Sequence, residues 1–278
     1  MDKIAIIGLG LIGGSFAKAL RQRFPKSYIL GIDLDAGTCR QALEQGVIDS
    51  TDIAELPGMR GCMLCLYPQT TVDFCRVNAD LFVPGQIVMD ACGVKRRIVE
   101  TLEPFFARRG VAYIGCHPMA GREVSGYANA LPDLFMGHSF LIARTAHTTE
   151  STADFAAEFA VRSGFSRVVF TTPEEHDRVI ALTSQLAHIV SSAYIKSPTA
   201  QKQDGFTGGS FQDMTRVARM NDNMWPELFL SNREYLLTEL RGLIAELQRY
   251  EDALTAADAE ELRCLMQEGT ARRLEIGT

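Results

Sequence analysis

A glycine-rich turn close to the N-terminus constrains the fold of this chain more than any other feature. The apolar run Lys3–Ile7 predicts a strand, and a G-x-G-x-x-G pattern, Gly8–Gly13, follows it directly. Ser15–Arg23 then has helical spacing, and a second predicted strand, Tyr28–Ile32, ends at Asp33. A glycine turn in this context, with an acidic residue after the second strand, is typical of a dinucleotide-binding βαβ unit.

Each part of the turn has a physical role in binding a dinucleotide. The first glycine allows the turn, the second lets the backbone approach a pyrophosphate, and the third lets helix and strand pack closely, with the phosphate at the helix N-terminus. Asp33 would accept hydrogen bonds from the adenosine ribose and repel a 2′-phosphate, and Leu34 and Asp35 provide no arginine to neutralise one. We therefore predict NAD rather than NADP; the alternative is a βαβ turn that binds no nucleotide. The predicted cofactor-binding residues are Gly8, Gly10, Leu11, Ile12, Gly13, Asp33, Tyr67 and Thr70.

The alternation of strands and helices continues beyond this unit. Strand patterns occur at Gly61–Leu66, Gln86–Met89, Val111–Ile114, Ser139–Ala143 and Arg167–Phe170, mostly separated by helical patterns. This arrangement predicts an α/β fold with a doubly wound, Rossmann-type, mostly parallel sheet. The ends of its strands would line the cofactor cleft.

The pattern changes near Thr171, after which apolar residues recur at helical spacing. Thr172–Glu175 has the signature of a helix N-terminus, with proline at the first helical position. Helices are predicted from there to about Lys196, over Phe211–Met220, from Trp225 to about Tyr250, and over Ala256–Ile276. We therefore expect a Rossmann-like domain over 1–171 and an all-helical domain over 172–278.

Composition argues against several classes of protein. The formal net charge is −6 and there is no Lys/Arg block, so we expect no nucleic-acid partner. No apolar run approaches the roughly 20 residues of a membrane span. The seven cysteines lack paired spacing, which favours a reducing compartment and leaves no Cys/His cluster for a metal. With no leader-like N-terminus, we expect a cytoplasmic protein without a metal site.

His117 is the first candidate for chemistry. It lies in the stretch GCHPMAGREVSG at the end of a predicted strand, and Pro118 favours extended backbone before it. A side chain at the end of such a strand lies at the rim of the sheet, where ligands bind. Histidine is the usual proton acceptor near neutral pH, although a lone histidine can equally be a packed or capping residue.

The helical region offers further candidates. His188 shares a helix face with Ser184 and Gln185, in an apolar setting that fits a structural role as well as a site. Asp213 and Arg216 are three residues apart and could form a surface ion pair, while arginine is also the best partner for a substrate carboxylate. The remaining histidines, which we expect at the surface, are His138, His147 and His176.

These motifs together resemble those of the prephenate and arogenate dehydrogenases of tyrosine biosynthesis, over nearly the whole chain. The shared elements are GLGLIGGS at Gly8–Ser15, D-x-x-x-V-K at Asp90–Lys95, GCHPMAGRE from Gly115, the helix with Ser184 and His188, and FQDMTRVA…MWPELFLSN within Phe211–Asn232. The glycine turn occurs in many dehydrogenases. HPMAG followed by the Arg216 and Trp225 segments is much more specific.

The resemblance implies oxidative decarboxylation of a cyclohexadienyl acid, with prephenate giving 4-hydroxyphenylpyruvate and carbon dioxide. His117 matches the family's catalytic histidine, which takes the proton of the ring hydroxyl as hydride leaves for the nicotinamide. Arg216 matches the arginine that holds a substrate carboxylate, and His188 matches a second active-site histidine. The family's helical domain forms a homodimer, which fits the long apolar face after Trp225.

The sequence departs from the family at two positions. Gly93 replaces the serine that hydrogen-bonds the catalytic histidine and the substrate hydroxyl, so we expect water or another group, such as Ser125, to act there. Gln185 replaces the first histidine of the family's S-H-x-x-H. Both changes bear on the choice of substrate and on pH behaviour.

Three alternatives follow from the same residues. The substrate could be arogenate or an amino-substituted prephenate, with Glu123 as the acidic partner of its amine. The chain could bind NAD as a sensor without turnover. A β-hydroxyacid or ketopantoate-type dehydrogenase generally uses a lysine on a helix of its second domain, where this chain has His188, with Lys196 only at the helix end.

Overall fold

A seven-stranded sheet organises the first part of the chain in the computed structural model, which describes residues 3–277. The strand order is β2-β1-β3-β4-β5-β6-β7, and all neighbours are parallel except β5 and β6. The strands are β1 (Lys3–Ile7), β2 (Tyr28–Ile32), β3 (Gly61–Leu64), β4 (Ile87–Asp90), β5 (Ala112–Pro118), β6 (Ser139–Ala143) and β7 (Arg167–Thr171). The predicted Rossmann-type, mostly parallel sheet is confirmed.

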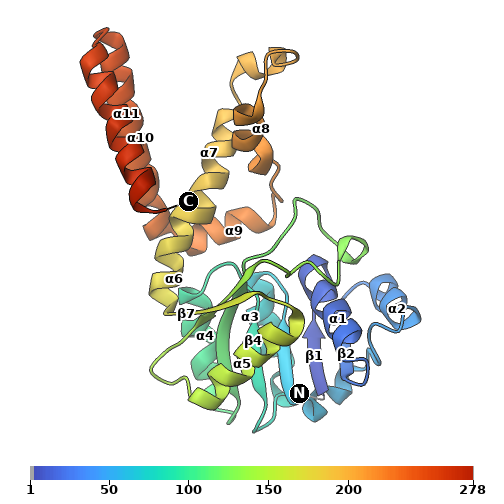
Figure 1. The fold of residues 1–278 in the computed structure, drawn as a ribbon. Coiled ribbons are helices and arrows are strands. Elements are labelled where there is room, and N and C mark those ends of the chain that lie inside the picture. The colour runs from blue at the N-terminus through green and yellow to red at the C-terminus, as the bar shows by residue number, and fades with distance from the viewer. Residues whose placement is uncertain (1–2, 278) are drawn as a thin grey trace.

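Helices cover both faces of this sheet (Figure 1). They are α1 (Leu11–Arg23), α2 (Ala36–Glu44), α3 (Pro68–Val77), α4 (Arg96–Ala107) and α5 (Glu150–Ser163). On one face, Phe16 of α1 packs against Phe159 of α5 with ring centroids 5.0 Å apart. On the other, Phe106 of α4 stacks on Tyr113 of β5 at 5.6 Å. These two buried layers hold the ends of the strands in fixed positions.

The chain reverses its strand order between β1 and β3, which places a crevice at that point. β1 pairs with β2 on one side and β3 on the other, so the connections after β1 and β3 leave the sheet next to each other. Ligands of doubly wound sheets bind at such a switch point, outside the carboxyl ends of the strands. The glycine turn after β1 and Tyr67 after β3 therefore lie at the expected edge.

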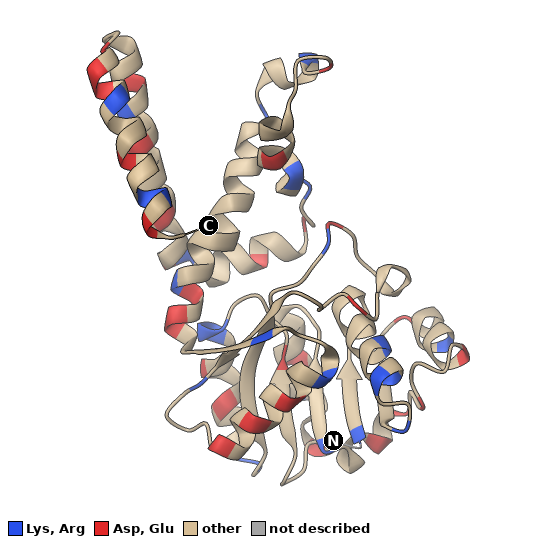
Figure 2. Cartoon of the chain, in the orientation of Figure 1, with Lys and Arg blue, Asp and Glu red and all other residues tan. Residues whose placement is uncertain are grey.

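Beyond Thr171 the described chain is helical. Its helices are α6 (Pro173–Ile180), α7 (Ala187–Tyr194), α8 (Gly209–Thr215), α9 (Met224–Ser231), α10 (Arg233–Thr255) and α11 (Ala259–Glu275). α10 and α11 form a hairpin that projects away from the sheet, separate from the arm of α7 and α8 (Figure 1). Acidic and basic residues intersperse along the hairpin (Figure 2), and Arg249 of α10 bonds Glu268 of α11 at 2.9 Å.

All four helices predicted beyond Thr171 differ in part from the observed ones. The first is continuous but contains a π-helical turn, Ala181–Leu186, between α6 and α7. The second ends at Thr215 and gives way to a 3₁₀ turn, Arg216–Ala218. The last begins at Ala259, because Asp258 caps it by accepting from two backbone N–H groups.

The predicted helix from Trp225 to Tyr250 is interrupted at Asn232, which separates α9 from α10. The Asn232 side chain is buried and donates to the backbone oxygen of Asp177 and to Oε1 of Gln185, both at 2.8 Å. These tertiary bonds hold the residue outside helical geometry. Periodicity cannot reveal them, since both partners are distant in the sequence.

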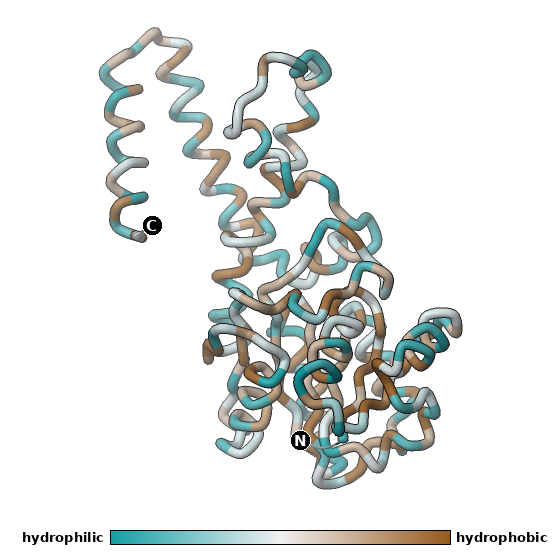
Figure 3. The backbone as a smooth tube through the Cα atoms, turned by 45° about the vertical axis from the view of Figure 1, so that its right-hand side comes forward, coloured by the Kyte–Doolittle hydropathy of each residue, from teal (hydrophilic) through white to brown (hydrophobic). Residues whose placement is uncertain are grey.

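Hydrophobic and hydrophilic residues alternate along the helices of the second part (Figure 3). Ile244, Leu247 and Leu254 lie on one stripe of α10 and are 55%, 58% and 66% exposed. Within residues 3–277, no helix combines the length and the apolar content needed to cross a membrane.

Candidate active site

The glycine turn has the shape that a pyrophosphate requires. A β carbon on Gly13 would lie 1.8 Å from the oxygen of Gly8, so only glycine lets α1 pack against β1 here. Gly8 has a φ of +88° and its own β carbon would meet the oxygen of Cys65 at 2.6 Å. Beside Gly10, by contrast, nothing lies within 4 Å. The turn therefore leaves open space at the one glycine where a phosphate would approach.

The N-terminus of α1 is free to bind an anion. Gly10 caps the helix without a side-chain hydrogen bond, and the first turn contains no acidic residue. The backbone N–H groups of Leu11 and Ile12 therefore point outward with the positive end of the helix dipole. Both residues are half-buried at this end of the sheet. Such groups are suited to binding the pyrophosphate of a dinucleotide.

Asp33 is tied to the glycine turn. The backbone N–H of Leu9 donates to its Oδ2 at 2.7 Å, and that of Asp35 donates to its Oδ1 at 2.9 Å. The carboxylate is thus held at the end of β2, beside the turn that would carry the cofactor. This position fits the predicted contact with the adenosine ribose.

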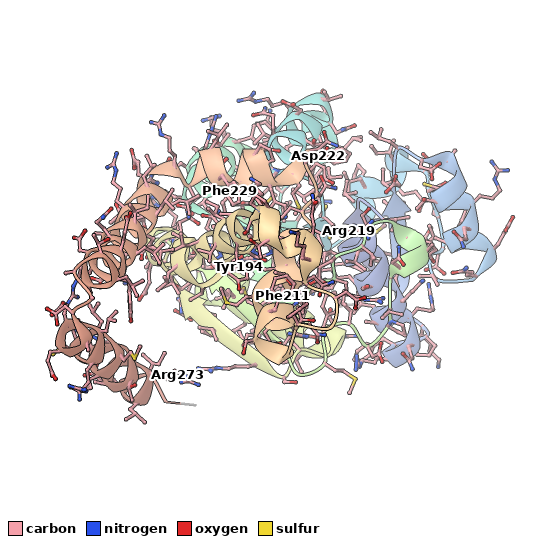
Figure 4. All side chains as sticks on the ribbon, turned by 90° about the horizontal axis from the view of Figure 1, so that it is seen from above. Tyr194, Phe211, Arg219, Asp222, Phe229 and Arg273 are labelled. Carbon is pink, nitrogen blue, oxygen red and sulfur yellow. The ribbon has the colours of Figure 1, made fainter. Side chains whose placement is uncertain are left out.

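Tyr67 and Thr70 lie at the start of α3, across the crevice from α1. Both are exposed, and the Tyr67 hydroxyl accepts from Nδ2 of Asn221 at 3.4 Å. The backbone N–H of Gln69 donates to the carboxylate of Glu227 on α9. The helical region therefore touches the rim of the predicted cofactor crevice. Seen from above, Arg219 and Asp222 mark the segment that leads from α8 to α9, while Arg273 lies far away on α11 (Figure 4).

His117 is the penultimate residue of β5, which runs four residues beyond the predicted end at Ile114. The added length comes from antiparallel pairing, in which His117 faces Leu141 of β6. Its side chain is half-buried, and a β carbon on Gly93 would lie 3.9 Å from its Nε2. The position of the family's serine is therefore in contact with the imidazole.

The prediction that His176 lies at the surface is wrong. Its side chain is 2% exposed, and its Nε2 lies 2.9 Å from Nδ1 of His117. Its Nδ1 lies 2.8 Å from Oδ1 of Asp177. Pro173, His176 and Ile180 form a buried stripe on α6, and their spacing is the signal in the sequence that identifies this face.

The electrostatic setting keeps His117 neutral. Burial lowers the pKa of its imidazole well below the usual range, and the positive charge of Lys95 acts in the same direction. Lys95 is fully buried and paired with Asp90, whose Oδ1 also accepts from the Tyr113 hydroxyl at 2.6 Å. A neutral imidazole with an unbonded nitrogen can accept a proton near pH 7.

His188 lies on the helical side of the site. Its Nδ1 donates to the oxygen of Ser184, 2.8 Å away in the π-helical turn, and its ring packs on Trp225 with centroids 4.0 Å apart. Burial lowers the pKa of this imidazole. Gln185, in place of a family histidine, is buried and donates to the oxygen of Leu228 at 3.2 Å.

Arg216 pairs with Glu123, and no hydrogen bond or ion pair joins it to Asp213 among the described residues. Its NH1 lies 2.8 Å from Oε1 of Glu123 in the loop after β5, with both side chains partly exposed. Ser125 is exposed in the same loop, and within residues 3–277 no hydrogen bond connects its hydroxyl to His117. The structure therefore brings Arg216 and Glu123 together and gives His117 a different partner, His176.

Two comparisons by sequence cover almost the whole chain. The model of the prephenate dehydrogenase nucleotide-binding domain matches residues 16–169, and that of the prephenate dehydrogenase dimerization domain matches residues 172–268. Prephenate dehydrogenase of Bacillus subtilis is 28% identical over 94% of this chain and 72% of its own. The nucleotide-binding description agrees with the predicted NAD cofactor.

Solved structures of similar proteins share the fold. Prephenate dehydrogenase from A. aeolicus, in complex with hydroxyphenyl propionate and NAD+, is 28% identical with a TM-score of 0.87, covering 99% of this chain and 98% of that one. Synechocystis arogenate dehydrogenase is 26% identical with a TM-score of 0.82, covering 99% of each chain. The chain therefore belongs to the prephenate dehydrogenase family of oxidoreductases.

Proposed function

We propose that the chain is an NAD-dependent prephenate dehydrogenase of tyrosine biosynthesis, acting as a cytoplasmic homodimer. The reaction converts prephenate and NAD+ to 4-hydroxyphenylpyruvate, carbon dioxide and NADH. When bound, NAD supplies the hydride acceptor. The single observation that carries the proposal is the placement of His117 at the end of β5, where its Nδ1 meets His176 while its Nε2 has no hydrogen-bond partner among the described residues.

His117 acts as the general base. Its Nε2 accepts the proton of the ring hydroxyl as the carbon beneath that hydroxyl is oxidised, and loss of the ring carboxylate as carbon dioxide then makes the ring aromatic. Gly93 lies beside this nitrogen, because a β carbon on Gly93 would stand 3.9 Å from Nε2. A base placed in this way contributes about 10²–10⁴ in rate.

Arg216 and His188 bind the substrate in this proposal. Arg216 is more than half exposed, and its only ionic partner among the described residues is Glu123, so a substrate carboxylate can reach its guanidinium. His188 uses Nδ1 on the Ser184 oxygen, which leaves Nε2 for a substrate oxygen. Ser125 and the space beside Gly93 would complete the pocket, with water in place of the missing serine hydroxyl.

A second candidate substrate, arogenate, is favoured by one specific observation. Glu123 lies 2.8 Å from Arg216, so a carboxylate is already present where the side chain of the substrate would be held. An amine in place of the side-chain ketone would find an acidic partner there. The similarity to Synechocystis arogenate dehydrogenase is a second reason to measure turnover of arogenate beside that of prephenate.

The dimer is proposed on the helical face. Ile244, Leu247 and Leu254 expose an apolar stripe of α10 that nothing covers within residues 3–277. Such a stripe is expected to be buried against a partner. The description of the second family model as a dimerization domain supports a second copy of this chain as that partner.

The test is an assay of NADH formation by the purified protein with prephenate and with arogenate. We expect turnover of prephenate, a loss of about 10²–10⁴ in the His117→Asn variant, and unchanged turnover in the His138→Asn control, whose side chain is exposed. Faster turnover of arogenate would favour the second candidate. NAD binding with no turnover of either acid between pH 6 and 9 would instead support a sensor.

A further inference from the structure

His117 stands at the end of a buried chain of hydrogen bonds that runs through two residues of α6. Nδ1 of His117 lies 2.9 Å from Nε2 of His176, and Nδ1 of His176 lies 2.8 Å from Oδ1 of Asp177. We propose that His176 and Asp177 are positioning residues, which fix the proton of His117 on Nδ1 so that Nε2 presents its lone pair to the substrate. This inference rests on the proposed function of His117 as the base.

Asp177 sets the direction of the hydrogen bonds in this row, because its carboxylate oxygens only accept hydrogen bonds. Its Oδ1 accepts from the backbone N–H of Lys95 at 2.7 Å and its Oδ2 from that of Arg96 at 2.9 Å. These groups form the N-terminus of α4, whose dipole favours a negative charge at this position. Asp177 is 1% exposed, and two backbone N–H groups already donate to its carboxylate oxygens. The nitrogen of His176 that faces it must carry a proton.

The tautomers of both histidines follow from this constraint. His176 is buried, and burial lowers its pKa, so the ring is neutral and carries one proton. With that proton on Nδ1, its Nε2 is an acceptor. The Nδ1 of His117 must then be the donor, and its Nε2 has the lone pair that a base requires. Reversing any one of these assignments would set two lone pairs or two protons against each other.

Residues of the helical region also hold this row of hydrogen bonds in place. Asn232 donates to the backbone oxygen of Asp177 and to Oε1 of Gln185, and Gln185 donates to the oxygen of Leu228 beside the pocket. All three side chains of this brace, Asp177, Gln185 and Asn232, are buried. The break between α9 and α10 and the π-helical turn therefore support the residue that orients His176. A shift of the helical region would move the base through this connection.

The consequence for the reaction is electrostatic. When Nε2 of His117 accepts the substrate proton, the ring becomes an imidazolium whose Nδ1–H still donates to His176. The carboxylate of Asp177 stabilises that positive charge through His176. A carboxylate that holds a catalytic imidazole in one tautomer has this effect in the Ser-His-Asp triad, where the wrong tautomer costs about 10⁴ in kcat.

The first test reads the tautomers directly and does not depend on activity. Long-range ¹⁵N–¹H NMR of histidine-labelled wild-type protein, with signals assigned through the His117→Asn and His176→Asn variants, should show both His117 and His176 as neutral rings protonated on Nδ1. A His117 protonated on Nε2 overturns the inference. Absence of turnover in the wild type would contradict the proposed function instead, and the tautomers would still be decided.

The second test compares two substitutions of nearly equal size. The glutamine of His176→Gln keeps an oxygen that can accept from Nδ1 of His117. The shorter asparagine of His176→Asn keeps only an N–H group that can donate to Asp177. We expect kcat to fall about 10²-fold in the asparagine variant, the cost of a misplaced catalytic group, and less than about tenfold in the glutamine variant. NAD affinity should not change in either. Equal losses in the two variants would show a merely structural role and overturn the inference.

Discussion

The backbone of Gly93 lies against the imidazole of His117: a β carbon built on the glycine would stand 3.9 Å from Nε2. The nearest other atoms, on Leu228, would be 3.5 Å away, which is ordinary van der Waals contact. The missing serine of the family is thus a matter of one hydroxymethyl group, and there is space for its β carbon.

The Gly93→Ser variant should therefore fold normally and gain activity. Its hydroxyl can bridge Nε2 of His117 and the substrate hydroxyl, so we expect kcat/KM for prephenate to rise about twofold to tenfold, the value of one net hydrogen bond. The Gly93→Ala variant adds the same carbon without the hydroxyl and is the matched control. Equal activities in the two variants would show that the hydroxyl has no role.

The pH dependence of the rate should report the lowered pKa of His117. The base must be neutral to work, and its pKa lies below the usual 6.5 because of burial and the charge of Lys95. Activity is therefore retained as pH falls from 8 to 6.5 and is lost only at lower pH, as the ring gains a proton. The measurement is kcat/KM for prephenate against pH. A midpoint of loss above 6.5 would contradict the assignment, and the residual activity of His117→Asn should lack this acid limb.

Asp33 should decide between NAD and NADP. Its carboxylate is held by the Leu9 N–H at 2.7 Å and would repel a 2′-phosphate. In the Asp33→Asn variant, we expect the Kd of NAD to rise about tenfold or more, since a hydrogen bond to a charged group is lost, and the preference over NADP to fall. The control is Asp35→Asn, because asparagine caps α2 as well as aspartate does. An unchanged ratio of the two affinities in Asp33→Asn would exclude this role.

Arg216 should affect the substrate and not the cofactor. Loss of a charge-assisted bond to a carboxylate predicts a rise of about 10–100-fold in the KM of prephenate for Arg216→Ala. The Kd of NAD should stay within twofold of that of the wild type. The Glu123→Gln variant separates the two substrates, because it removes the partner of an amine and frees the guanidinium. It should raise the KM of arogenate and leave that of prephenate equal or lower.

Local sequence patterns predicted the sheet, the glycine turn and the order of the helices. Gly8, Gly10 and Gly13 have roles that follow from their neighbours in the chain, and the structure shows the close approaches and the open space that those roles need. Strand and helix periodicity depends on residues a few positions apart, so it can be recognised in the sequence without knowledge of the tertiary fold.

The partners of the site residues could not be predicted in the same way. His117 and His176 are 59 residues apart, Arg216 and Glu123 are 93 apart, and Asn232 meets Asp177 across 55. Each pair forms only when the helical region packs against the end of β5 and α4. The sequence contained a local clue for His176 alone, in the buried stripe of α6.

The apolar stripe of α10 should be required for dimer formation. Leu247 is 58% exposed in the single chain and lies between Ile244 and Leu254 on the same stripe. A charge at its centre would be buried on association at a cost of several kcal/mol, so the Leu247→Glu variant should be monomeric at micromolar concentration where the wild type is dimeric. Light scattering coupled to size-exclusion chromatography measures this. The control is Val77→Glu, an exposed apolar position on α3 that should leave the dimer intact. A Leu247→Glu protein that stays dimeric would place the interface on another surface.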